Sequence, residues 1–250
     1  MNTFLIIITI IYGIIIGSFL NVCIYRIPKN ESIVMDRSHC MTCGHKLKWY
    51  DLVPLVSYLT LGGKCRYCKT KISKQYPVIE FTNGVLYGIL VVVNGFNIST
   101  ILFCLCSSAL LALSVIDWRT FEIPIAFNIF IGILGIIRLL TDLEHWYVYI
   151  IGFFAVSGFL YLLFLITKGR GIGGGDIKLM AAAGLLIGWK NIILALGIGC
   201  VLGSIIHIIL MKVQNKERVL AFGPYLSLGI YIAMLYGNQI IEWYINTFIY

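Results

Sequence analysis

Charge is scarce in this chain. Lys and Arg number 19 and Asp and Glu 11, so charged residues make up only 12% of the 250 residues, whereas 60% are hydrophobic. A soluble domain usually carries roughly 25% charged and 45–50% apolar residues. The composition therefore excludes a water-soluble globular domain, and it also excludes a disordered chain. Because a bilayer-spanning helix needs about 20 mainly apolar residues, the sequence predicts a polytopic membrane protein.

Several other features are missing. The first apolar segment has no basic residues before it and no A-x-A-like site after it, so we expect a retained helix rather than a cleaved signal. No internal repeat or low-complexity run is present. No nucleic-acid-binding motif accompanies the net charge of +8, so we expect no nucleic-acid partner.

The apolar residues fall into eight segments separated by polar turns. The second and sixth are short for a span, and residues at their ends would lie at the membrane interface. We expect an all-α polytopic membrane protein with about eight transmembrane helices. Three parts are predicted: a first transmembrane helix at 1–25, a polar insert at 26–76 and a seven-helix bundle at 77–250. The segments run over residues 2–25, 78–93, 98–116, 123–140, 146–167, 177–189, 192–211 and 222–245.

The basic residues are unevenly placed along the chain. Ten of the 19 Lys and Arg residues lie in the insert. Cytoplasmic loops of membrane proteins carry an excess of these residues, so this bias predicts a cytoplasmic insert. If the eight helices cross the membrane in alternating directions, starting from a cytoplasmic insert, 17 basic residues lie inside and only Arg138 and Lys190 lie outside. The net positive charge is therefore interpreted as a topological signal.

Two Cys-x-x-Cys pairs stand in the insert, Cys40/Cys43 and Cys65/Cys68, with 21 residues between them. Each pair can place two sulfurs on one side of a metal, so together they predict a four-thiolate zinc site. Such a site is structural, because four protein ligands leave no position for a catalytic water. Two disulfides are the alternative, which a reducing cytoplasm disfavours.

The residues around these pairs fit the same interpretation. Gly44 and the Gly62-Gly63 pair permit tight turns beside the cysteines. His39 and His45 could substitute as ligands, but four thiols make them unnecessary. The remaining cysteines are expected to be packing residues in apolar segments: Cys23, Cys104, Cys106 and Cys200.

Three carboxylates lie in or beside apolar segments, where they are costly and indicate function. Glu80 opens the second segment, Asp117 closes the third, and Asp176 opens the sixth. Both aspartates are predicted at the cytoplasmic boundary. Two carboxylates about 3 Å apart share one proton, so one can activate a water while the other polarises a peptide carbonyl. The alternative is that both are helix-end residues, with Asp176 as an N-cap.

A glycine run, Gly173-Gly174-Gly175, immediately precedes Asp176. It permits close approach of a peptide backbone, so these glycines, with Lys178 just beyond, are candidate substrate-binding residues. A phosphate-binding loop is the alternative. That loop requires a G-x-x-x-x-G-K-[ST] pattern, which is absent here.

At this point the sequence resembles the prepilin peptidases, also called type IV leader peptidases. The run from Gly173 to Leu179 is similar to the GGGDxKL signature of that family. The resemblance covers nearly the whole chain, and the combination of motifs is specific. The other similar stretches are GSFLNV at 17–22, RIP at 26–28, the four-cysteine insert, PVIEF at 77–81, Asp117 with Pro124, and AFGPY at 221–225.

The resemblance implies an aspartic endopeptidase of the bacterial inner membrane. It implies that Asp117 and Asp176 catalyse removal of a short basic leader from prepilins or pseudopilins, after a glycine at the cytoplasmic face. Many members also N-methylate the new amino terminus with S-adenosylmethionine, an activity associated with the cysteine region. The expected cofactors are structural zinc and S-adenosylmethionine, and the expected partners are prepilin-like substrates and the lipid bilayer.

A basic insert does not attract a basic leader, so acidic groups must offset its charge. Glu80 is the best candidate to bind the leader's cations or the amine to be methylated, followed by Glu31, Asp36 and Asp51. The alternative is that Glu80 pairs with an insert lysine such as Lys74. Two departures from the family pattern bear on substrate preference: Ala221 where proline is common, and the stretch WRTFEIP at 118–124.

Three other classes of protein compete with this interpretation. A transporter would use the acidic residues as a proton or cation relay, but it predicts mid-membrane carboxylates and repeated broken helices. A non-enzymatic assembly protein would use the zinc insert for docking and would need neither aspartate. A presenilin-like intramembrane protease would share the G-x-G-D motif but would give no reason for the insert.

Overall fold

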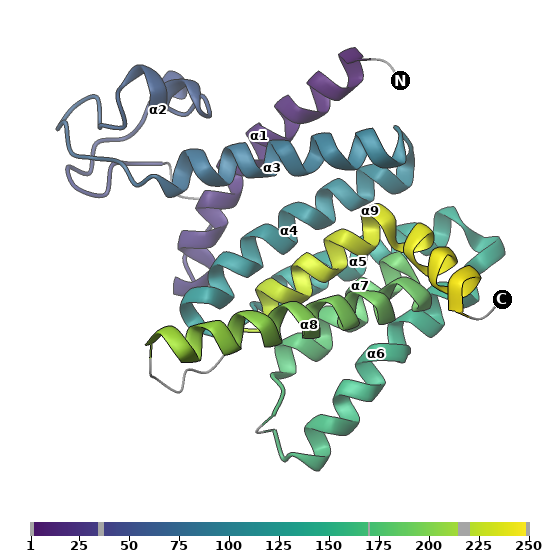
Figure 1. The fold of residues 1–250 in the computed structure, drawn as a ribbon. Helices are drawn as coiled ribbons and strands as arrows, with labels where there is room; N and C mark the ends of the chain where they lie inside the picture. The colour runs from purple at the N-terminus through teal and green to yellow at the C-terminus, as the bar shows by residue number, and fades with distance from the viewer. Residues whose placement is uncertain (1–2, 35–37, 170, 215–220, 249–250) are drawn as a thin grey trace. The chain divides into compact units, whose positions relative to one another are not determined.

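The computed structural model describes residues 3–34, 38–169, 171–214 and 221–248. Within these ranges every extended regular element is an α-helix, and the only β-type pairing is two isolated bridges in the insert. Short 3-10 turns at 27–29, 49–51 and 143–145 join some of the helices. The helices are α1 (Thr3–Arg26), α2 (Val56–Thr60), α3 (Gln75–Asn94), α4 (Ile98–Thr120), α5 (Ile125–Thr141), α6 (Trp146–Ile166), α7 (Gly174–Ile187), α8 (Trp189–Gln214) and α9 (Gly223–Phe248) (Figure 1).

Each of the eight apolar segments overlaps one long helix, which confirms the all-α fold. Among the described residues, five helical stretches are long and apolar enough to cross a membrane: 3–29, 75–94, 98–120, 143–166 and 189–209. The chain is therefore a multi-pass membrane protein. Membrane crossing by α5, α7 and α9, and with it the total of eight spans, stays a prediction, as does the division at residues 25 and 76.

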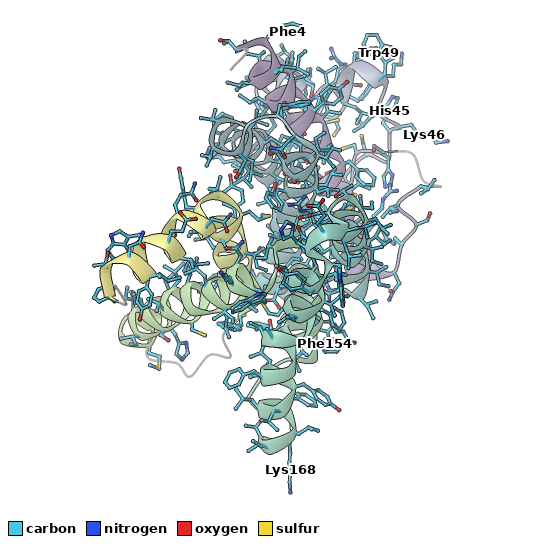
Figure 2. All side chains as sticks on the ribbon, turned by 90° about the vertical axis from the view of Figure 1, so that its right-hand side faces the viewer. Phe4, His45, Lys46, Trp49, Phe154 and Lys168 are labelled. Carbon is cyan, nitrogen blue, oxygen red and sulfur yellow. The ribbon has the colours of Figure 1, made fainter. Side chains whose placement is uncertain are left out.

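The outward-facing side chains of the helices are apolar. On α1, Ile7, Ile11 and Ile15 recur at four-residue intervals, and each is about half exposed. On α6, Phe154 is 64% exposed and projects away from the helix (Figure 2). A stripe of exposed large apolar side chains suits contact with lipid and would be a liability in water.

The chain divides into two compact units, Met1–Ala112 and Leu113–Tyr250, with the boundary inside α4. In the first unit α1 packs on α3 through small residues. A Cβ atom at Gly13 would lie 2.9 Å from Cα of Gly84, and one at Gly17 would lie 2.7 Å from Cα of Glu80. Glycines four residues apart let membrane helices approach closely, so this G-x-x-x-G pattern fixes the α1–α3 pair.

Buried polar side chains connect α1, α3 and α4 in this unit. The Asn83 amide donates to the carbonyl of Gly13 at 2.7 Å, and its oxygen accepts from the Ser108 hydroxyl at 2.9 Å. Tyr87 and Ser108 also share a 2.9 Å hydrogen bond. In an apolar surrounding, polar groups that pair across helices hold them in register.

In the second unit α7 packs against both α5 and α6, and α8 lies alongside α9 (Figure 1). The α5–α7 contact has a regular register, because Gly132 faces Ala182 and Gly135 faces Leu185. Both helices therefore run in the same direction. The α6–α7 contact is closer still, since Gly152 and Gly184 touch backbone to backbone.

The turn between α5 and α6 is organised by Asp142. Its carboxylate accepts from the Tyr149 hydroxyl at 2.6 Å and bonds the His145 ring at 2.9 Å. The Tyr149 hydrogen bond, followed by the His145 contact, holds the pKa of Asp142 below its ordinary value. Asp142 is thus a carboxylate with a local structural role, unlike the three acidic residues singled out above.

Candidate active site and metal centre

The four insert cysteines converge on one point. Their Sγ atoms all lie within 4.8 Å of one another, and the Sγ atoms of Cys40 and Cys68 are 3.8 Å apart. Thiolates at about 2.3 Å from a tetrahedral zinc lie about 3.8 Å from each other, so the spacing fits a four-thiolate metal site. The same distance is too long for a disulfide bond.

Each Cys-x-x-Cys pair is shaped by the same backbone pattern. The N–H of the residue after the second cysteine donates to the carbonyl of the first: Gly44 to Cys40 at 2.8 Å, and Lys69 to Cys65 at 3.0 Å. Gly44 and Lys69 both have positive φ, at 67° and 60°. The two halves of the insert are therefore equivalent knuckles, each presenting two sulfurs.

The local surroundings favour thiolates at two of the four positions. The Thr70 hydroxyl and backbone lower the pKa of Cys68 to about 6. Backbone hydrogen bonds from Cys43 and Thr42 lower the pKa of Cys40. Thiolates, not thiols, are the form that binds metal.

The alternatives for this cluster do not hold. None of the eight cysteines forms a disulfide. His45 stacks on the ring of Tyr67, with centroids 3.6 Å apart, and neither His45 nor His39 belongs to the cluster. The side chains of His45, Lys46 and Trp49 mark the outer surface of the insert (Figure 2).

Glu80 is buried near the start of α3 and ties the insert to the helix pair. Its Oε2 atom accepts from the backbone N–H of Leu55 at 2.8 Å. Leu55 lies 25 residues earlier and has positive φ, so its N–H is turned toward α3 by the unusual backbone. Among the described residues no ion pair joins Glu80 to Lys74, the pairing named above as the alternative.

The other acidic candidates lie apart from Glu80. Asp51 is bound by Arg66 at 2.7 Å, so its charge is already compensated. Glu31 is exposed near the end of the first helical segment. Asp36 lies outside the described residues. Leader binding by Glu80 therefore stays a proposal, and the Leu55 contact adds a structural role that the sequence did not indicate.

Two substitutions of Glu80 separate these roles. Glu80→Gln keeps an acceptor for the Leu55 N–H but removes the charge, so we expect unchanged thermal stability and a KM for a basic leader raised roughly 5- to 10-fold. Glu80→Ala leaves the Leu55 N–H without its acceptor and should cost about 1–3 kcal/mol of stability. Melting curves and cleavage kinetics measure both effects. An unchanged KM in Glu80→Gln would show that the charge is not used for binding.

Asp117 lies in the last turn of α4 and is 5% exposed. Its Oδ2 atom accepts from the backbone N–H of Gly223, the first residue of α9, at 2.9 Å. The first N–H groups of a helix have no partner within it and favour negative charge. The AFGPY stretch therefore brings the start of α9 onto the carboxylate. Gly223 is a site residue that the sequence interpretation missed, although its motif was noted.

Gly223 cannot be enlarged without moving Asp117. A Cβ atom there would lie 2.7 Å from Oδ2 of Asp117, which is below any normal contact. We expect Gly223→Ala to lower stability by about 1–3 kcal/mol and to slow cleavage about 100-fold, because the carboxylate loses its position. The matched control is Gly197→Ala on α8, where a Cβ meets nothing within 4 Å. Equal activity of the two variants would contradict this role for Gly223.

Asp176 lies in the first turn of α7 and is 9% exposed. The helix begins at Gly174 with Gly173 as its N-cap, so the alternative in which Asp176 is an N-cap is wrong. Gly174 and Gly175 are likewise helical and not part of a preceding turn. A helix can start on glycines here because the first-turn N–H groups need no helical partner.

The three glycines have different surroundings. A Cβ at Gly173 would lie 3.0 Å from Oδ2 of Asp176, so this glycine leaves room for the carboxylate. A Cβ at Gly175 would lie 3.0 Å from Cβ of Ile123, in the segment between α4 and α5. Only Gly174 faces open space. Of the three, Gly174 is thus the position most available to a substrate backbone.

These contacts bring the two aspartates together. Gly175 docks α7 against Ile123, in the segment that follows Asp117, so the two aspartates lie at neighbouring helix ends. Lys178 is exposed and stands two positions from Asp176, so it projects from roughly the opposite side of the helix. The site is therefore a pair of buried carboxylates at two helix ends.

A shallow apolar hollow of about 250 Å³ lies along α4 beside Asp117. Trp118 and Arg119, flanking residues of the same helix, line it together with Pro224 from the start of α9. The hollow is almost entirely apolar, and Asp117 is not among the residues that line it. It is suited to an apolar segment of another chain.

Paired carboxylates on membrane helices, together with a four-cysteine insert, define a class: polytopic membrane proteins of aspartic-protease type. Comparison with known proteins places the chain within it. The Bacterial Peptidase A24 N-terminal domain matches residues 11–94, and the Type IV leader peptidase family matches residues 104–208, a range that contains both aspartates. No solved structure matches the chain.

Curated relatives extend over most of the chain. A prepilin leader peptidase/N-methyltransferase of Pseudomonas aeruginosa is 32% identical, covering 95% of this chain and 92% of the relative. One with the same name from Bacillus subtilis is 34% identical, covering 94% and 96%. The chain therefore belongs to the type IV leader peptidase family, a family of proteases.

Proposed function

We propose that the chain is a membrane aspartic endopeptidase that removes the basic leader of prepilins or pseudopilins, and that Asp117 and Asp176 are its catalytic residues. The observation that carries this is the burial of two carboxylates at the neighbouring ends of α4 and α7, which Ile123 and Gly175 bring together. The relatives whose names state this activity match nearly the whole chain, which supports the substrate class.

The chemistry follows from the unequal surroundings of the two carboxylates. Asp117 accepts a backbone N–H at the start of α9, which stabilises its ionised form. In the proposed reaction Asp117 takes a proton from water, whose oxygen attacks the scissile carbonyl carbon. Asp176, protonated, donates to the carbonyl oxygen. The proton held by Asp117 then passes to the leaving amine as the peptide bond breaks, and the diol proton returns to Asp176.

The substrate's position follows from its two halves. The positive-inside bias supports a cytoplasmic insert in a bacterial inner membrane, with both aspartates at that face. The substrate's apolar helix would lie along the apolar hollow at the end of α4. Gly174 is proposed to face the scissile backbone, and Glu80 is proposed to bind the leader's cations. Gly173, Gly175 and Lys178 are not proposed to touch the substrate, because the contacts described above give each of them another neighbour or direction.

The insert is proposed to hold one zinc through its four thiolates, as a structural site. Its backbone knuckles already direct the sulfurs to one point, and about 50 residues bury too small a core to fold without a metal or a covalent cross-link. Zinc would fix the fold of the insert. N-methylation of the new amino terminus with S-adenosylmethionine is proposed from the relatives' names, and no residue of this chain is assigned to the donor.

Co-expression with a prepilin-like substrate tests the proposal. The wild-type chain should shorten the substrate by its leader, and mass spectrometry of the mature terminus should find one added methyl group. A full-length substrate beside well-expressed, membrane-inserted enzyme would contradict the endopeptidase. Cleavage without methylation would contradict only the second activity.

A further inference from the structure

Asn128, on α5, is buried without a partner. Its side chain is 5% exposed, and neither its Oδ1 nor its Nδ2 atom bonds any group within the described part of the chain. Leaving a buried polar group unpaired is unfavourable, and an asparagine leaves both a donor and an acceptor unpaired. A leucine of similar size would avoid this cost, so an asparagine at this buried position needs a physical explanation.

The helix register places Asn128 beside the aspartate pair. Ile123, just before α5, faces Gly175; Gly132 faces Ala182; and Gly135 faces Leu185. Residue n of α5 thus lies level with residue n+50 to n+52 of α7. Position 128 therefore lies level with 178–180, within about one helical turn of Asp176.

Asn128 also belongs to the face of α5 that meets α7. Positions 128, 132 and 135 are spaced by four and three residues, which lie on one side of a helix. Cα–Cβ bonds in a helix tilt toward its N-terminus, so the Asn128 amide is directed back toward the level of Asp176. The unpaired amide therefore lies in the α5–α7 interface, directed toward the carboxylate.

A second unpaired group accompanies it. The Ser227 hydroxyl on α9 is buried and unbonded among the described residues, and it lies one turn after Gly223, which binds Asp117. Each aspartate thus has a buried, unpartnered polar group about one helical turn away along a neighbouring helix: Asn128 on α5 for Asp176, and Ser227 on α9 for Asp117. Buried polar groups that lack protein partners typically bind water.

We propose that Asn128 holds a buried water beside Asp176 and positions the Asp176 carboxylate through it. The amide can donate one hydrogen bond to this water and accept another, and the water bonds the carboxylate in turn. Asn128 is thus a positioning residue, which acts on the reaction through Asp176. This inference rests on the proposed aspartic mechanism.

The test uses the purified full-length enzyme and a prepilin substrate. Asn128→Leu should fall about 30- to 100-fold in kcat with KM changed less than about 3-fold, because a misplaced carboxylate slows the chemical step. Its melting temperature should stay close to that of wild type, because leucine has a similar size and leaves no polar atom without a partner. Asn128→Thr, which keeps a donor and an acceptor, should recover most of kcat.

Asn191→Leu is the matched control. Asn191 is half-buried and has a buried, unpaired Oδ1, but its Nδ2 bonds the carbonyl of Ile187 at the far end of α7, roughly 16 Å or more from Asp176. Its loss should lower stability and leave kcat per folded molecule unchanged.

Three results would overturn the inference: wild-type kcat in Asn128→Leu, a raised KM with unchanged kcat, or a fall in activity that only follows a fall in stability. Wild-type and Asp176→Asn enzymes are measured alongside. An inactive wild type, or an active Asp176→Asn, would instead overturn the proposed function.

Discussion

Asparagine in place of either Asp117 or Asp176 is expected to abolish leader cleavage, with the rate reduced by at least about 10³-fold. Asparagine keeps the size and one oxygen of aspartate, but it can neither take up nor release a proton in the reaction. In Asp117→Asn the side-chain oxygen can still accept the Gly223 N–H, so the start of α9 should remain in place. Each single variant should be as inactive as the double variant, because the pair acts as a unit.

The comparison needs a carboxylate outside the site. Asp142→Asn serves, because Asp142 bonds Tyr149 and His145 in the turn between α5 and α6. It should cleave at the wild-type rate per folded molecule, with a small loss of stability. Expression, membrane insertion and melting temperature are measured for all variants. Residual cleavage in Asp117→Asn or Asp176→Asn above about a thousandth of the wild-type rate would contradict the paired mechanism.

Cys40→Ser is expected to reduce bound zinc from about one per chain to almost none, and the insert should then become sensitive to protease. One serine leaves three thiolates, and the symmetric knuckles lose the metal that joins them. Because metal binding supplies much of the folding free energy of such small domains, a strong chelator should have the same effect on wild type. Elemental analysis and limited proteolysis measure the two effects.

Cys200→Ser is the control for this experiment. Cys200 is an exposed residue of α8 and lies outside the cluster, so its loss should leave the zinc content unchanged. Wild-type protein purified without metal, yet with a protease-resistant insert, would contradict the structural zinc site. Undiminished zinc in Cys40→Ser would contradict this choice of ligands.

The helices were largely predictable because lipid imposes long apolar runs. Predicted and observed ends of most segments agree closely, as in the run at 146–167 and α6 at Trp146–Ile166. The starts of α3 and α7 were placed three residues too late. Gln75 and Gly174 are polar or small, so hydrophobicity did not mark them, although each begins a helix that carries a site residue.

The candidate site was predictable in its chemistry but not in its contacts. Carboxylates beside membrane helices and paired cysteines are rare enough to stand out from their residue type and spacing alone. The Gly223–Asp117 hydrogen bond joins residues 106 apart, and the Leu55–Glu80 bond depends on an unusual backbone at Leu55. Such contacts follow from the packing of the helices, which residue spacing does not encode.

The two knuckles illustrate the same limit within one domain. Gly44 indicated a left-handed turn after the first cysteine pair, because glycine adopts positive φ readily. The equivalent turn after the second pair is occupied by Lys69, also at positive φ, which no residue preference would predict. The equivalence of the two halves became evident only from their shared backbone hydrogen bonds.

The most direct test of the account is the intact mass of a purified prepilin after incubation with the purified, reconstituted enzyme. The paired-aspartate mechanism predicts two products from wild type, a short basic leader and a mature chain cut after a glycine, and neither product from the Asp117→Asn, Asp176→Asn double variant. An uncut substrate with wild type, or the same two products with the double variant, would contradict it.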